Sequence, residues 1–169
     1  MTVHASIPLP AENALTPFIL LRHELIEAFA TVELTICQCL ARFVPDFKLA
    51  DATPLSAKIK ALESAKASPQ LSKAHLDRIQ AACKPFPGLL KTRAAVVHGK
   101  LRTGVVDTIP IAVFQDSASM ARSMNCHVLL TESDFHSDIQ TLLRLEGVLR
   151  GVLHARVPTP PSCSPEQPA

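Results

Sequence analysis

Apolar residues recur at three- and four-residue steps over residues 17–44, which is the spacing of one face of an α-helix. Polar residues fill the other positions, and Pro45 follows the stretch. The pattern predicts a long first helix, ~40 Å at 1.5 Å per residue, that forms either a spine for the other helices or a dimer element. The apolar stripe consists of Phe18, Leu21, Leu25, Phe29, Val32, Ile36 and Phe43.

Three Ser/Thr-Pro pairs in the first half of the chain each predict the start of a helix. They are Thr16-Pro17, Thr53-Pro54 and Ser68-Pro69. Ser or Thr can accept hydrogen bonds from the free amides of a first turn, and Pro fits the first helical position, where no donor is needed. Two short helices should therefore follow the first one. Their expected apolar positions are Leu55, Ile59 and Leu62 in one, and Leu76, Ile79 and Cys83 in the other.

A fourth helix should run from about Pro87 to His98, with Gly99 as a left-handed cap residue. The period then changes to two, because apolar residues alternate over 109–113 and again over 126–130. Two short strands are therefore expected, joined by a loop over 115–123. Pro110 would place the first of them at an edge of the sheet.

The segment from Thr131 to Asp134 resembles a capping box. In this motif the Thr side chain and the acidic side chain each accept a hydrogen bond from a backbone amide. It predicts a last helix over 132–154. The whole pattern is that of a mainly α domain over residues 17–156 with a small two-stranded β insertion before the last helix. Residues 1–16 are expected to be a flexible segment and residues 157–169 a disordered Pro/Ser-rich tail.

Composition narrows the class of protein. The 5 cysteines form no Cys-x-x-Cys pair, which favours reduced thiols in a cytoplasmic protein over disulfides or a metal site. Residues 1–17 lack the pattern of a signal peptide, and charged residues interrupt the apolar stretch 26–44, so no membrane span is expected. We expect neither a metal nor another cofactor.

Charge is distributed unevenly along the chain. No acidic residue occurs over 78–106, although six cationic residues do. Such a run is either a solvated face or the electrostatic footprint of a polyanion. With no Trp or Tyr and 7 Phe, stacking of nucleic-acid bases on aromatic rings is nearly excluded. The cations are Arg78, Lys84, Lys91, Arg93, Lys100 and Arg102.

Arg93 is the one anomaly in the fourth predicted helix. It lies in the middle of the apolar face, between leucines and valines three or four residues away. A buried guanidinium is costly unless it is paired or placed beside a water-filled cleft. Its best internal partner is Glu33, at the edge of the first helix's stripe. Arg93 is therefore expected to be mostly buried and to meet that carboxylate, as a structural ion pair between two helices or as part of a site.

His98 is expected in the last turn of the same helix, where the helix dipole favours a cation. It would serve either as a helix-capping residue or as a group that donates and accepts protons. A five-residue offset separates Arg93 and His98 by about 140° around the helix, so the two side chains would not touch. Two copies of the helix facing each other across a dimer axis would bring them to one phosphate.

The segment Arg93-Ala94-Ala95-Val96-Val97-His98-Gly99 resembles the R-x-x-x-x-H motif of the HEPN superfamily (higher eukaryotes and prokaryotes nucleotide-binding domains). A long first helix with Phe29-Ala30-Thr31-Val32-Glu33, short Pro-interrupted helices and a Thr-initiated last helix also resemble bacterial members. The similarity extends over residues 17–153 as an architecture.

The resemblance implies an antiparallel helical bundle that forms a homodimer with the motif helices facing each other across a cleft. Active members cleave RNA without a metal, and many are toxins or phage-defence effectors with antitoxin or other protein partners. By this resemblance Arg93 would hold the scissile phosphate and His98 would act as general acid or base. Lys91, Lys100 and Arg102 would support the site electrostatically, and Glu33 would support Arg93.

Two functions stay open at this point. The first is a HEPN-like metal-independent endoribonuclease that acts as a homodimer, and the basic segment favours it. The second is a non-catalytic homodimer of the same fold that binds a nucleotide or a protein partner. Ala94 favours the second, because active members commonly have a polar residue directly after the arginine.

Overall fold

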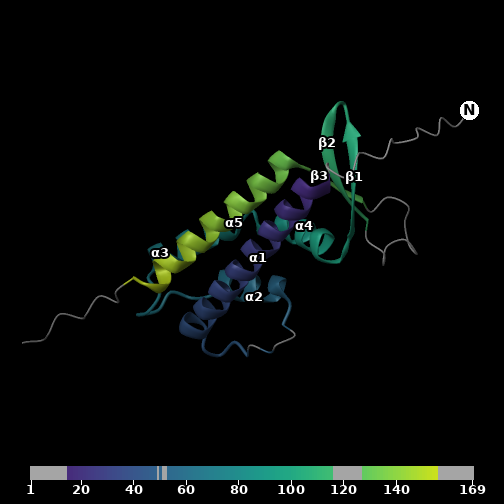
Figure 1. Cartoon of the computed structure of the whole chain (residues 1–169). Coiled ribbons are helices and arrows are strands. Elements are labelled where there is room, and N and C mark those ends of the chain that lie inside the picture. The colour runs from purple at the N-terminus through teal and green to yellow at the C-terminus, as the bar shows by residue number, and fades with distance from the viewer. Residues whose placement is uncertain (1–14, 49, 51–52, 116–126, 156–169) are drawn as a thin grey trace, which may run out of the picture.

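The structure is a computed structural model and describes residues 15–48, 50, 53–115 and 127–155. Within these residues the chain forms five helices and three strands (Figure 1). The helices are α1 (Leu15–Phe43), α2 (Leu55–Glu63), α3 (Lys73–Cys83), α4 (Phe86–His98) and α5 (Glu132–Leu153). The strands are β1 (Lys100–Val106), β2 (Ile109–Gln115) and β3 (His127–Thr131). The mainly helical class is therefore confirmed.

Helices α1 and α5 lie side by side and run in the same direction (Figure 1). At one end the rings of Phe18 and Phe135 are 6.1 Å apart. At the other end the Cys39 thiol lies 4.0 Å from the backbone oxygen of Leu149. Because both pairs advance along the two helices together, the two longest helices of the domain are parallel.

Helix α4 runs in the direction opposite to α1. Arg22, near the start of α1, donates to the carbonyl of Val96 at the end of α4, whereas Phe29 packs on Phe86 at its beginning. The antiparallel arrangement expected of the bundle therefore holds between α1 and α4 but not between α1 and α5.

The long first helix matches its prediction within two residues at either end. Every residue of the predicted apolar stripe is buried. Residues 1–14 and 156–169 lie outside the described part of the chain, so the flexible N-terminal segment and the disordered tail stay predictions. No helix in the described ranges combines the length and apolar content needed to cross a bilayer.

The Ser/Thr-Pro pairs mark helix starts unevenly. Helix α2 begins directly after Pro54, as expected, although the Thr53 hydroxyl accepts from the Ala50 amide and does not cap the helix. The Ser68 prediction is wrong, since α3 begins at Lys73 and its cap is Ser72. Ser68 instead exchanges backbone hydrogen bonds with Leu71 in a tight turn.

Gly99 ends α4 without being a left-handed cap. Its φ of −75° and ψ of 146° are those of extended backbone. A side chain at this position would collide with the Ala95 carbonyl and approach the Cβ of Phe114 to 3.2 Å. The glycine is therefore required mainly by the nearby backbone of α4 and to a lesser degree by Phe114 of β2, which a sequence pattern does not reveal.

The β insertion has three antiparallel strands in the order β1-β2-β3, not two. The missed strand is β1, whose alternation is obscured by Gly104 and by the cations at its start. Pro110 does not lie in an edge strand, because β2 is central. Pro110 pairs with Val105 of β1 at a position that β3 does not reach. The backbone N–H that proline lacks is therefore not needed for a hydrogen bond to β3. The predicted Cys126 position and loop residues 116–123 lie outside the described residues.

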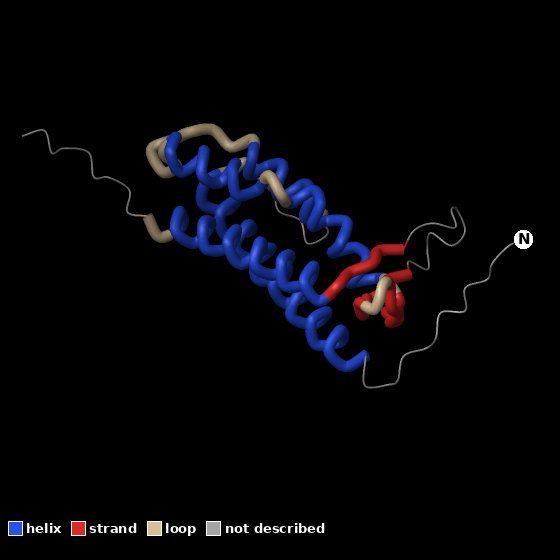
Figure 2. Tube along the Cα trace, turned by 90° about the horizontal axis from the view of Figure 1, so that it is seen from above, coloured by secondary structure: helices blue, strands red, loops and turns tan. Residues whose placement is uncertain are grey.

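The capping box at Thr131 is confirmed. Its hydroxyl accepts from the Asp134 amide and its own amide donates to the Asp134 carboxylate. Helix α5 therefore begins where the sequence predicts. The sheet lies at the end of the helical body where α1 and α5 begin (Figure 2), and Phe114 of β2 packs on Phe135 of α5 with ring centres 6.1 Å apart.

Candidate functional site

Helix α4 has two distinct faces at the position of the R-x-x-x-x-H motif. Phe86, Leu89 and Val96 are buried on the inner face, in the same stripe as Arg93. The outer face carries Lys91 and His98, both exposed to solvent. Arg93 and His98 therefore point to different sides of one helix, as their five-residue offset predicts.

Arg93 meets the carboxylate that the sequence indicated. Its Nη2 lies 3.2 Å from Oε2 of Glu33 on α1. Most of the Arg93 side chain is buried, as expected, although 34% of it is exposed. The flexible stem carries the guanidinium past the edge of the apolar stripe, where water reaches part of it. Its Nε is buried and has no partner within the described residues.

Lys58 on α2 completes this cluster and was missed by the sequence analysis. Its Nζ lies 2.6 Å from Oε1 of Glu33, and only 8% of its side chain is exposed. The hydrogen bond with Glu33 raises the pKa of Lys58, more than burial lowers it. A signal was available, since Lys58 interrupts the apolar spacing between Leu55 and Leu62 just as Arg93 interrupts that of α4.

One carboxylate thus serves two cations in this cluster. The Glu33–Lys58–Arg93 network joins α1, α2 and α4 and keeps a formal charge of +1. Glu33 neutralises the charge of Arg93 only in part, because Lys58 forms the shorter and more buried contact with the same carboxylate.

A second arginine, Arg22 of α1, lies at the end of α4 where His98 is found. Its Nε donates to the Val96 carbonyl at 2.7 Å and its Nη2 to the Val97 carbonyl at 3.4 Å. Its guanidinium also lies 5.8 Å from the centre of the Phe114 ring. The last carbonyls of a helix lack partners within the helix, and a cation there is favoured by the dipole. Arg22, and not Arg93, is therefore the cation bound next to His98 within one chain.

His98 is the last residue of α4, and none of the ion pairs among the described residues involves it. The strand that follows carries Lys100 and Arg102, both exposed and two residues apart, so they share one face of β1. His98, Lys91, Lys100 and Arg102 therefore lie on exposed surface of adjoining elements, while Arg93 reaches towards α1.

Helix α4 is also linked to α5 through Thr92 and Asp138. Burial raises the pKa of the Asp138 carboxyl, and a hydrogen bond from Thr92 partly offsets that effect. Thr92 therefore lies on the side of α4 towards Asp138, whereas Lys91 and His98 are exposed to solvent.

The described residues contain no group of three or more His, Cys, Asp or Glu side chains arranged to hold a metal ion. Comparisons of the chain with protein-family models, with curated proteins and with solved structures give no match.

Proposed function

We propose that this protein is a HEPN-like, metal-independent endoribonuclease that acts as a homodimer, with Arg93 and His98 at a composite site. The single observation that carries the proposal is the exposure of His98 at the end of α4 beside Lys100 and Arg102, in a segment without acidic residues. A polyanion would be attracted to this surface, and a neutral imidazole could remove a proton from a bound hydroxyl.

In the proposed reaction His98 takes the proton of an RNA 2′-hydroxyl. The 2′-oxygen then forms a bond to the adjacent phosphorus while the bond from phosphorus to the 5′-oxygen breaks. The 5′-oxygen receives a proton from water, and His98 returns the proton it took to the solvent. The products are a 2′,3′-cyclic phosphate and a 5′-hydroxyl. Arg93 would stabilise the charge on the phosphate oxygens. Its guanidinium is only partly neutralised by Glu33, which supports this role.

A second copy of the chain is required because Arg93 and His98 face different sides of α4. We propose that the two motif helices line one groove in a symmetric dimer. Exposed aliphatic residues on the outward face of α1 support a contribution of that helix to the interface. They are Ile19, Leu20 and Leu34.

The test is incubation of the purified protein with mixed RNA in EDTA, beside His98→Ala and His154→Ala. His154 is an exposed histidine at the far end of α5 and serves as the matched control. We expect the wild type and the His154 variant to cleave RNA to cyclic-phosphate ends and the His98 variant to lose more than about 100-fold in rate. Light scattering should give a dimer at micromolar concentration, and a monomer would remove the composite site.

The alternative is a non-catalytic HEPN-like homodimer that binds a nucleotide or a protein partner. The ion pair between Glu33 and Arg93 favours this alternative, because it keeps Arg93 on the side of α4 away from His98. Intact RNA in all three samples, together with a nucleotide-dependent rise in melting temperature, would support this second function.

A further inference from the structure

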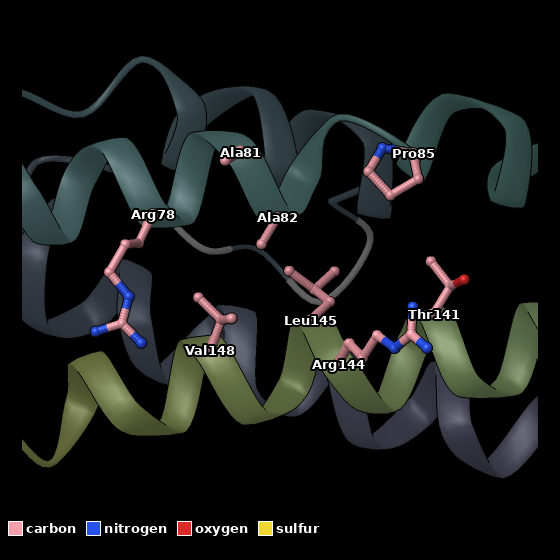
Figure 3. Close-up of a pocket in the computed structure, with 8 residues that line it drawn as sticks. All are labelled: Arg78, Ala81, Ala82, Pro85, Thr141, Arg144, Leu145 and Val148. Carbon is pink, nitrogen blue, oxygen red and sulfur yellow. The ribbon is translucent and has the colours of Figure 1, made fainter.

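A groove of about 500 Å³ lies between α3 and α5, on surface that contains none of the residues of the proposed ribonuclease site. This volume falls in the range of sites that hold small molecules. Figure 3 shows the two helices with the groove between them. The residues that line it are Arg78, Ala81, Ala82 and Pro85 from the α3 side, and Thr141, Arg144, Leu145 and Val148 from α5.

The middle of the groove is apolar and its two arginines lie towards opposite ends. Ala82 and Leu145 face each other in the centre (Figure 3). Arg78 extends from α3 beside Val148, whereas Arg144 lies nearer the Pro85 end. The lining extends over eight residues of chain on each side, and the seven steps between the first and the last correspond to ~10 Å along a helix.

Within the described part of the chain, neither arginine is paired with a carboxylate. None of the ion pairs among the described residues involves Arg78 or Arg144. The positions three and four residues away on the same helix, where an acidic partner would lie, hold no Asp or Glu for either residue. Arg150 of α5, in contrast, pairs with Glu146 one turn before it.

Two like charges on one apolar groove repel each other and attract an anion to it. A guanidinium binds a carboxylate in bidentate geometry, and the partly exposed alanine and valine side chains between them would bury an aliphatic chain. We propose that the α3–α5 groove binds an elongated aliphatic molecule with a carboxylate at each end, one at Arg78 and the other at Arg144.

The test is an NMR titration of the full chain, labelled at its methyl groups, with decanedioate as the probe. Decanoate, with one carboxylate, and decanediol, with none, are the matched ligands. We expect decanedioate to shift the methyl signals of Ala82, Leu145 and Val148. Decanoate should bind about tenfold more weakly, the equivalent of ~1.4 kcal/mol for one lost charge-assisted contact, and decanediol should leave the signals unchanged.

Arg78→Gln and Arg144→Gln should each weaken decanedioate binding about tenfold, whereas Arg150→Gln, outside the groove, should leave it unchanged. All three are exposed side chains, so the variants should retain the wild-type spectrum away from the groove. The proposal is overturned if decanedioate shifts none of these signals at millimolar concentration, or if decanoate binds as tightly. A response to oligouridylate in place of decanedioate would also overturn it and make the groove an RNA contact.

Discussion

The Glu33–Lys58–Arg93 network predicts that loss of Glu33 destabilises the fold much more than loss of Arg93. Replacing Glu33 by Gln removes the only carboxylate and leaves Lys58, 8% exposed, without a counter-charge. Stranding a buried charge in this way costs ~3–5 kcal/mol. Because the chain has about the size at which 1 kcal/mol shifts the melting temperature by ~2–4 °C, Glu33→Gln should lower it by at least about 6 °C.

Arg93→Met should cost much less, although Arg93 interrupts an apolar face. Glu33 keeps its 2.6 Å contact with Lys58 in this variant, and 34% of the Arg93 side chain is already exposed, so solvent screens its pair. A pair of this kind contributes ~1 kcal/mol or less. Methionine preserves most of the aliphatic stem, and the fall in melting temperature should therefore stay within about 4 °C.

Thermal unfolding followed by far-UV circular dichroism measures both melting temperatures, and urea unfolding by the same signal gives the free energies, since the chain has neither Trp nor Tyr for fluorescence. Lys91→Met, on the exposed face of the same helix, is the matched control and should change stability by less than about 0.5 kcal/mol. Equal losses for Arg93→Met and Glu33→Gln would refute this reasoning, because they would mean that Lys58 does not hold Glu33. A neutral Glu33→Gln would refute the network itself.

Three further predictions concern the fold. Gly99→Ala should cost ~1–3 kcal/mol, read as a lower melting temperature, because the added methyl group collides with α4 backbone; an unchanged value would contradict the packing role. Thr131→Ala should cost ~1 kcal/mol in urea unfolding through loss of the α5 cap, and Thr131→Ser should restore most of it. Burial raises the pKa of Cys39 and of Cys83 to about 12. The unfolded thiols ionise first, so stability should be constant below about pH 9 and fall by ~1.4 kcal/mol per pH unit per thiol above it. Free energies of unfolding at pH 8, 9 and 10 should lose most of that slope when both cysteines are replaced by alanine, and a slope that persists would assign it to other groups.

The sequence by itself determined the elements whose information is local. The apolar stripe of α1, the capping box at Thr131 and the end of α4 at His98 each depend on residues within a few positions of one another. Amphipathic spacing and side-chain caps act over that range. The Arg93–Glu33 pair could also be predicted, because a charge in an apolar face needs a partner and Glu33 lies at the edge of the apolar stripe of α1.

Tertiary structure decided what depends on contacts between distant segments. Strand β1 exists because β2 can pair with it along its whole length, and this pairing overrides a weak local pattern containing Gly104. Gly99 is needed because a side chain there would collide with the Ala95 carbonyl of α4 and crowd Phe114 of β2, not because its own φ is positive. Lys58 and Arg22 joined the candidate site only when α1, α2 and α4 came together. The number of partners around Glu33, and with it the exposure of Arg93, follows from helix packing that no local pattern specifies.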